Sequence, residues 1–190
     1  RYRNKAQYPV GISKDGSIAM GFYAGRTHSI IPCVDCKIGA AENRYILEII
    51  RSWMEQNNIM PYDEKSGQGL VRHVLIRTGY HTDEIMVCLV VNGNKLTDKH
   101  KESLVRRLTE VSTDSDISTE KSIASIMLNF NSDNTNVILG RKCETLWGKS
   151  YIEDFIGDVK YQISPLSFFQ VNPRQTEKLY GKALEFADLS

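Results

Sequence analysis

Cysteine is scarce in this sequence, which has four cysteines among 190 residues. That number is too small for a disulfide scaffold of this length, so we expect a reducing, cytoplasmic setting. No apolar run is long enough to span a bilayer and no signal peptide is visible, so a membrane protein is not expected. The formal net charge of +1 argues against a global field that attracts nucleic acid, although a local basic surface is compatible with it.

Sequence motifs for common chemistry are absent as well. The chain has no G-x-G-x-x-G, no Walker-type phosphate loop and no H-E-x-x-H. His73 could act as an acid or base near neutral pH, but no serine, aspartate or cysteine accompanies it in a recognisable motif. We therefore expect a structural histidine whose ring nitrogens are hydrogen-bonded. Generic motifs assemble no complete active site.

The hydrophobic pattern along the chain predicts a mixed α+β domain. Paired apolar residues one turn apart predict a helix over 40–56, and a second apolar face predicts a helix over 98–111. The order strand, helix, strand, strand, helix, strand is typical of a ferredoxin-like, split β-α-β unit, so we expect an antiparallel sheet with two packed helices. Strands are expected at 2–10, 18–22, 70–78, 84–91, 122–129, 151–155 and 159–163, short strands at 137–140 and 145–148, and an extended segment at 27–37.

The stretch 164–175 contains a clear helix start. Asn172 is a good N-cap, Pro173 suits the first helical position, and Gln175 completes a capping box. A helix of this kind should lead into a further element. We therefore expect one domain over 1–163 and the truncated start of a second domain over 164–190. The predicted helix carries an apolar stripe made of Leu179, Ala183, Leu184 and Phe186.

Cys33 and Cys36 form a C-x-x-C pair, which can hold a metal or form a redox disulfide. The other cysteines, Cys88 and Cys143, are isolated, so no second pair stands at zinc-finger spacing. A metal held by this chain alone is therefore disfavoured. Cys88 alternates with apolar residues in an expected strand and is expected to be a small core residue.

Basic and aromatic residues are interleaved on several expected strands and turns. Cations bind phosphates and aromatic rings stack on unpaired bases, so the pattern is compatible with RNA binding. The alternative is an ordinary solvated surface, which the pattern by itself favours. The basic members are Arg1, Arg3, Lys5, Arg26, Arg72, His73, Arg77, Arg141 and Lys142, and the aromatic members are Tyr2, Tyr8, Phe22, Tyr23 and Tyr80.

A set of short segments with a common order and spacing extends over nearly the whole chain. The segments are Tyr2-Arg3-Asn4-Lys5-Ala6-Gln7, Gly21-Phe22-Tyr23, Asp35-Cys36, Gly69-Leu70-Val71-Arg72-His73, Asn129, Thr135-Asn136-Val137-Ile138-Leu139-Gly140 and Phe168-Phe169-Gln170-Val171-Asn172. Together they resemble the S-adenosylmethionine-dependent RNA (uracil-5-)-methyltransferases, which modify ribosomal or transfer RNA. The 23S rRNA branch is the closer match, and the last segment is the most specific.

The resemblance implies a central, RNA-facing α/β domain over 1–163 and the start of a Rossmann-like methyltransferase domain over 164–190. In the family the glutamine of the last motif contacts the methyl donor, which implies this role for Gln170. A neutral amide suits the zwitterionic donor because it both donates and accepts hydrogen bonds. Phe168 matches an aromatic residue near the RNA and the cofactor. The alternative for Phe168 and Phe169 is plain interdomain core.

Many family members also hold a four-iron cluster with four cysteines. Three of these lie upstream of the position of Arg1, and the fourth lies at the position of Cys36, with Cys33 a less well-aligned alternative. The resemblance thus makes Cys36 a candidate fourth ligand of a 4Fe-4S cluster in the intact protein, and not in this chain alone. The family's nucleophilic cysteine, its base and its donor-binding loop lie beyond Ser190, so the chain alone is expected to be catalytically silent.

Two functions remain in view from the sequence. The first is part of an RNA uracil C5-methyltransferase that positions RNA, ribosomal before transfer RNA, and contributes to the S-adenosylmethionine cleft. The second is a stand-alone ferredoxin-like module that binds RNA or protein without catalysis.

Overall fold

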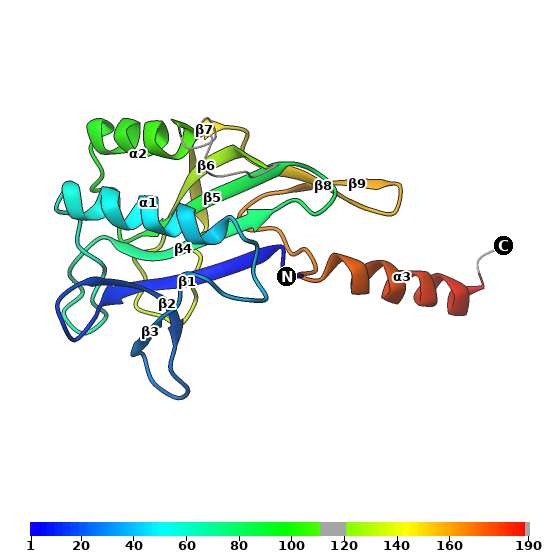
Figure 1. Ribbon diagram of the computed structural model, residues 1–190, viewed down its shortest axis with the longest axis horizontal. Helices are drawn as coiled ribbons and strands as arrows, with labels where there is room; N and C mark the ends of the chain where they lie inside the picture. The colour runs from blue at the N-terminus through cyan, green and yellow to red at the C-terminus, as the bar shows by residue number, and fades with distance from the viewer. Residues whose placement is uncertain (111–120, 189–190) are drawn as a thin grey trace.

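A seven-stranded sheet forms the body of the protein, and two helices lie across one of its faces (Figure 1). The computed structural model describes residues 1–110 and 121–188. The elements in chain order are β1 (Lys5–Ile12), β2 (Ile18–Tyr23), β3 (Ile30–Pro32), α1 (Asn43–Gln56), β4 (Val71–Thr78), β5 (Glu84–Val91), α2 (Asp98–Glu110), β6 (Ser122–Phe130), β7 (Lys142–Gly148), β8 (Ile152–Ile156), β9 (Val159–Ile163) and α3 (Pro173–Ala187). The sheet order is β3-β2-β1-β4-β5-β6-β7, with β5 and β6 parallel and the other neighbours antiparallel.

The first face of the sheet is covered by α1 and α2. Helix α1 turns Ile46, Ile50 and Trp53 toward the sheet at the spacing of one helical face, and all three are fully buried. Helix α2 adds the fully buried Leu104. The indole nitrogen of Trp53 donates a 3.2 Å hydrogen bond to the His100 carbonyl, which ties the two helices together.

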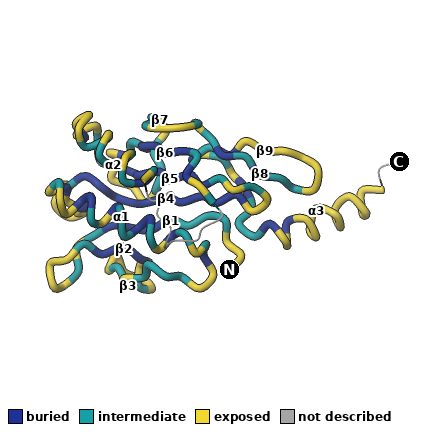
Figure 2. The backbone as a smooth tube through the Cα atoms, turned by 45° about the horizontal axis from the view of Figure 1, so that its top comes forward, coloured by how far each residue is buried: buried dark blue, intermediate teal, exposed yellow. Residues whose placement is uncertain are grey.

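The opposite face is covered by the β8–β9 hairpin and by the segment 164–172 that follows it. The central strands are therefore buried on both sides, and every residue of β4 is buried (Figure 2). Cys88 lies in this second core, as expected, and burial raises the pKa of its thiol. The second core consists of Leu75, Met86, Cys88, Met127, Ile152, Ile163 and Phe169.

The fold class expected from the sequence is confirmed as a mixed α+β structure with a mostly antiparallel sheet and two helices packed on it. Its ferredoxin-like description is not confirmed. In a split β-α-β unit the two parallel strands are separated by a third strand, but here β5 and β6 are direct neighbours, paired from Glu84–Ser122 to Val91–Phe130. The pattern of apolar residues defines strands and does not define which strands pair.

The expected extended segment 27–37 and the expected short strand 137–140 differ in the structure. Within 27–37 only Ile30–Pro32 is a strand. The segment 137–140 is a loop whose backbone is bound by two asparagine side chains instead of a neighbouring strand. The Asn129 amide exchanges hydrogen bonds of 2.7 and 2.8 Å with the Gly140 N–H and carbonyl, and Asn131 Nδ2 donates to the Ile138 carbonyl at 3.0 Å. The other expected elements are confirmed with small shifts of their ends, and residue 111 lies outside the described residues.

A buried carboxylate joins the β8–β9 hairpin to the turn between β4 and β5. Asp154 is fully buried, and its two carboxylate oxygens accept hydrogen bonds from the backbone N–H groups of Tyr80 (2.8 Å) and His81 (2.9 Å). Lys121 Nζ and the Thr82 hydroxyl donate to backbone carbonyls in the same region. This contact fixes the hairpin, and hence the start of segment 164–172, against the sheet.

We predict that Asp154→Ala lowers the free energy of unfolding by about 2 kcal/mol or more, because it removes a fully buried carboxylate that accepts two part-buried backbone hydrogen bonds. Urea denaturation of the purified chain measures the change. Asp158→Ala, at the exposed turn of the same hairpin, is the matched control and should change the value by less than about 0.5 kcal/mol. Equal effects of the two substitutions would contradict the role of Asp154.

Candidate functional site

The segment 164–172 is held on the sheet by a buried cation. Arg77 is 2% exposed, and its Nη2 donates to the carbonyls of Pro165 (3.3 Å) and Ser167. The turn is closed by a 3.2 Å bond from the Ser167 N–H to the Ser164 carbonyl. Burial lowers the pKa of Arg77 to about 10, so the guanidinium stays charged at neutral pH. A cation that binds two backbone carbonyls therefore orients the residues that follow.

The N-terminal residues lie between segment 164–172 and the loop of the C-x-x-C pair. The Asn4 N–H donates to the Val171 carbonyl at 3.1 Å, and the Asn4 side-chain amide donates to the Gln170 carbonyl at 3.0 Å. On the other side, the N–H groups of Tyr2 and Arg3 both donate to the Ile38 carbonyl at 3.0 Å. Three motifs that are far apart in the sequence thus meet at one end of β1.

The three residues of the Phe-Phe-Gln motif have different environments. Phe169 is buried in the second core, where its ring lies 5.6 Å from that of Tyr161. Phe168 is 84% exposed, so it is not core within this chain. Gln170 is partly buried, and its side-chain amide has no hydrogen bond within the described residues. Phe168 and the Gln170 amide are therefore available to other groups, and Phe169 has a packing role.

Positive charge surrounds this end of β1. Lys5 pairs with Arg77 across the β1–β4 ladder, and its pKa is lowered by burial and then by the charges of Arg77 and Arg3. Within the described residues none of the three side chains forms an ion pair with a carboxylate. An unpaired cluster of this kind favours an anionic group beside the Gln170 backbone.

Helix α3 begins at this site and projects away from the sheet (Figure 1). The Asn172 side chain accepts from the Gln175 N–H at 3.3 Å, as the capping pattern predicted. Arg174 Nε donates to the Tyr80 hydroxyl at 2.6 Å, which anchors the first turn to the body of the protein. No helix in the described residues has the length and apolar character needed to cross a membrane.

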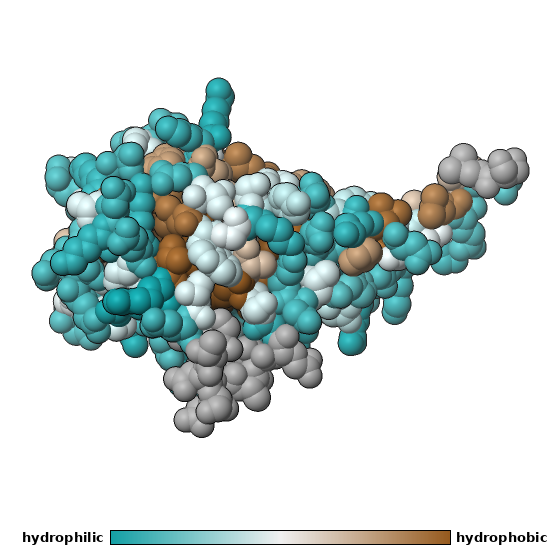
Figure 3. Space-filling model, turned by 90° about the horizontal axis from the view of Figure 1, so that it is seen from above, coloured by the Kyte–Doolittle hydropathy of each residue, from teal (hydrophilic) through white to brown (hydrophobic). Residues whose placement is uncertain are grey.

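Beyond Thr176 every described residue of α3 is exposed. The apolar stripe expected there forms but faces solvent, and Figure 3 shows it as hydrophobic patches along the projecting helix. Leu179 is 59% exposed and Phe186 is 81% exposed. The helix thus presents an apolar surface that nothing in the described residues covers.

The C-x-x-C pair lies in the loop between β3 and α1. Cys33 and Cys36 are both half-buried free thiols. The pKa of Cys33 is raised by burial and then by the neighbouring Cys36 and Asp35. Among the residues that the structure describes, no group of three or more histidine, cysteine or acidic side chains is placed to hold a metal. Two thiols do not make a four-cysteine cluster site, so these residues do not fit a 4Fe-4S cluster by themselves.

His73 differs from the sequence expectation. It is 6% exposed, yet neither ring nitrogen has a hydrogen-bond partner in the described part of the chain. Burial, and secondarily the charge of Arg72, lowers the pKa of His73 to about 4. Arg72 itself is buried and donates to the carbonyls of Asn131 (2.9 Å) and Asp133 (2.8 Å). His73 is thus a neutral, unsatisfied imidazole, a property that sequence spacing cannot reveal.

No protein-family model matches the chain. Over its full length it is 48% identical to an uncharacterized RNA methyltransferase of Clostridium tetani and 45% identical to one of Staphylococcus epidermidis, of which it covers 39% and 40%. Its fold is similar to the crystal structure of Pyrococcus abyssi tRNA (uracil-54, C5)-methyltransferase in complex with S-adenosyl-L-homocysteine. That similarity has a TM-score of 0.75 and 26% identity, and it covers 97% of this chain and 40% of the other.

These similarities first define a class: the chain is homologous over its whole length to RNA methyltransferases. Together with the fold they are consistent with the RNA (uracil-5-)-methyltransferase family, in agreement with the resemblance seen in the sequence. The chain spans about two fifths of the length of the relatives it matches.

We predict that Arg77→Met loosens segment 164–172, because it removes hydrogen bonds from a charged donor worth about 1.5–3 kcal/mol each. Amide exchange at Ser167 and Asn4 should then speed up about tenfold or more, as followed by NMR. Arg106→Met, at an exposed arginine of α2, should leave both amides unchanged. Unaltered exchange in Arg77→Met would show that the sheet orients the segment without this cation.

A second prediction concerns the pH dependence of stability. Because the pKa of His73 is about 4 in the folded protein and ordinary in the unfolded chain, the unfolded state binds more protons between about pH 6.5 and 4. The free energy of unfolding should therefore fall by about 3 kcal/mol from this residue as the pH drops through that window. His73→Phe should flatten the dependence in urea denaturation series. If the free energy of unfolding depended on pH in the same way in both proteins, the assignment of this dependence to His73 would be wrong.

Proposed function

We propose that this chain is the RNA-facing and cofactor-edge part of an S-adenosylmethionine-dependent enzyme that methylates C5 of uridine in RNA. The observation that carries the proposal is the meeting of Asn4, Gln170 and Phe168 at the start of α3, in a chain homologous to RNA methyltransferases. There the side chain of one motif holds the backbone of another, while the Gln170 amide and the Phe168 ring are left free. This arrangement supports a role at the edge of a larger site.

The domain boundary proposed from the sequence is supported by the same region. Residues 1–163 contain the sheet and its two covering helices, and residues 164–172 lead into the projecting α3. An exposed apolar stripe on a helix is stable in water only at a cost, so a domain that packs on α3 would bury it. We propose that α3 begins the methyltransferase domain.

The chemistry of the free groups suits S-adenosylmethionine. The Gln170 amide can donate and accept hydrogen bonds with the donor's zwitterionic amino-acid end, and the exposed Phe168 ring can contact a planar base. The unpaired charges of Arg3, Lys5 and Arg77 favour a nearby carboxylate or phosphate. S-adenosylmethionine supplies the electrophilic methyl group, and the chain's own residues bind and orient at the edge of the cleft.

Catalysis itself is assigned to residues outside this chain. Methylation at C5 requires a thiolate that adds to C6 of uracil and a base that later removes the C5 proton. Cys88 is fully buried with a raised thiol pKa, and Cys143 accepts a hydrogen bond from the Asn129 amide at 3.2 Å. Neither is placed to attack a base, so the chain alone should be inactive.

For the thiols of the C-x-x-C loop we propose a partial role. Cys36 would be one ligand of a 4Fe-4S cluster whose other cysteines the longer protein supplies, and Cys33 is the alternative ligand. Both are half-buried and free, which supports access without supplying a complete site.

The RNA substrate class follows from the resemblance, which favours ribosomal RNA, whereas the similar crystal structure is of an enzyme that acts on transfer RNA. The competing function is a binding module without catalysis. Incubation of the full reading-frame product with labelled S-adenosylmethionine and either RNA, followed by nucleoside analysis, separates all three. 5-Methyluridine in ribosomal RNA supports the proposal, 5-methyluridine in transfer RNA alone changes the substrate, and its absence from both supports the module.

We predict that Gln170→Ala in the full-length protein raises KM for S-adenosylmethionine by up to about tenfold, the effect of losing a hydrogen bond or two. KM for RNA should change little. Gln162→Ala, at an exposed glutamine of β9, is the matched control. A donor KM equal to that of the control would remove Gln170 from the cofactor site.

A further inference from the structure

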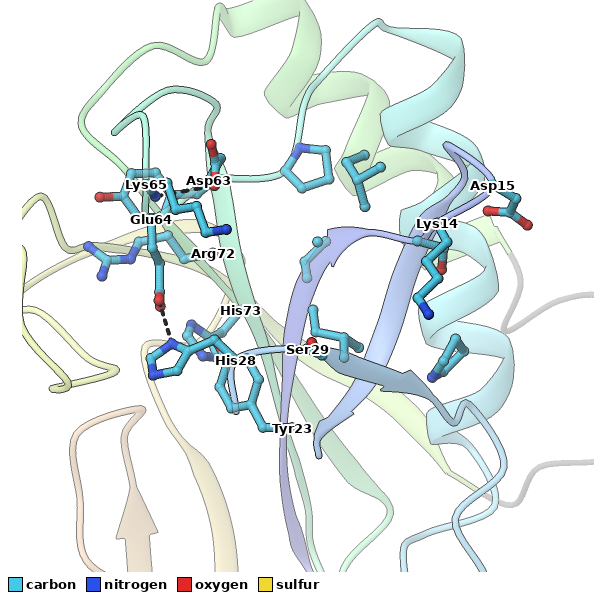
Figure 4. Close-up of a pocket in the computed structure, with 18 residues that line it drawn as sticks. Lys14, Asp15, Tyr23, His28, Ser29, Asp63, Glu64, Lys65, Arg72 and His73 are labelled. Carbon is cyan, nitrogen blue, oxygen red and sulfur yellow. Dashed lines mark hydrogen bonds and ion pairs between the residues drawn. The ribbon is translucent and has the colours of Figure 1, made fainter. Parts of the chain in front are cut away.

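An open groove lies at the end of β4 opposite to Gln170. It has a volume of about 980 Å³ and is formed where the β1–β2 turn, the β2–β3 connection and the loop before β4 meet (Figure 4). Its size is within the range of ligand-binding sites. His73 lines it with both ring nitrogens unpartnered among the described residues. A buried polar group without a partner costs free energy, so a ligand that supplies hydrogen bonds there would recover it.

Three aromatic rings are gathered on one side of the groove. Tyr23 is 40% exposed; its ring lies 5.3 Å from that of His28 and 6.4 Å, edge-on, from that of His73. His28 is held by Glu64, at 2.5 Å from its Nδ1 (Figure 4). An exposed aromatic face in a cluster that is already ordered is a surface on which a base stacks at low entropic cost.

The carboxylates at the groove are hydrogen-bonded, two within their own loops and one to a neighbouring loop. Asp15 accepts from the Ser17 N–H and hydroxyl, and Asp63 accepts from the backbone of Lys65 and from Ser66. The Glu64 carboxylate is paired with the ring of His28. The hydrogen bonds from Ser17 and Ser66 lower the pKa of Asp15 and of Asp63, so both carboxylates stay negatively charged, and contacts to phosphate are expected at the lysines instead.

The lysines at the groove are free by comparison. In the described residues neither Lys14 nor Lys65 forms an ion pair, and both are exposed at the rim. Arg72 lies deeper, 4.5 Å above the ring of Tyr62, with its charge directed to backbone carbonyls. The groove thus offers a stacking surface and a neutral imidazole that can donate and accept hydrogen bonds. Two lysines with exposed side chains lie at its edge.

We propose that this groove binds an unpaired nucleoside of the RNA substrate, distinct from the uridine that is methylated. The base stacks on Tyr23, its polar edge meets His73, and Lys14 and Lys65 contact the flanking phosphates. Arg77 follows His73 by four positions in β4, about 13 Å at the usual rise, so one RNA strand can reach both ends of β4. The inference rests on the proposed function because it takes RNA as the substrate.

The test uses the chain with a fluorescein-labelled, unstructured RNA oligomer and its duplex, with affinity measured by fluorescence anisotropy. We expect the single strand to bind more tightly than the duplex. Tyr23→Ala should weaken single-strand binding by about fivefold or more, and Tyr23→Phe should retain it. Lys14→Gln should reduce the slope of log affinity against log salt by about 1.

Trp147→Ala is the matched control, because Trp147 is equally exposed, at 40%, and lies on β7 at the opposite edge of the sheet. Failure of the unsubstituted chain to bind the oligomer, equal binding of strand and duplex, or equal effects of Tyr23→Ala and Trp147→Ala would each overturn the groove assignment. Methyl transfer by the full-length protein is scored separately. If the full-length protein transfers methyl groups and Tyr23→Ala does not weaken RNA binding, only the groove assignment is refuted. If the full-length protein transfers no methyl group to RNA, the proposed function is refuted.

Discussion

Burial of β4 on both of its faces is the constraint on which the rest of the structure depends. Val74 and Ile76 pack under the two helices, while His73, Leu75 and Arg77 point into the opposite layer. Apolar residues in this strand are stabilised by removal from water, but its buried polar or cationic groups, such as Arg72, His73 and Arg77, must be hydrogen-bonded locally or remain costly. Where each of them lies determines what each end of the strand does.

At the end of β4 that carries Arg77, the buried cation is hydrogen-bonded to the backbone of another segment. The Arg77 guanidinium gives its hydrogen bonds to the backbone of segment 164–172, and that segment in turn receives the amide of Asn4. The result is a short, hydrogen-bonded segment before α3 in which Phe169 is core while Phe168 and Gln170 stay available. A buried charge that binds carbonyls orders a loop more strongly than apolar packing alone, because its geometry is directional.

At the start of β4, only one of the two buried polar side chains is hydrogen-bonded in the described residues. Arg72 finds the carbonyls of Asn131 and Asp133, but His73 finds no partner in the described residues and is held neutral by its surroundings. Unsatisfied buried groups are uncommon in folded proteins and often mark sites that a ligand completes. The two ends of a single strand therefore connect the proposed cofactor edge to the proposed RNA groove.

The sequence by itself determined the local elements, since helical periodicity, the Asn172 cap and strand alternation act within a few residues. It also indicated the resemblance to a family, because that resemblance depends on the order and spacing of short motifs. Only the tertiary structure decided that β5 and β6 are neighbours, that Asn4 meets Gln170, and that His73 is unsatisfied. These properties depend on contacts between distant segments, and a residue's burial or hydrogen-bond partner is set by what packs against it rather than by its neighbours in the chain.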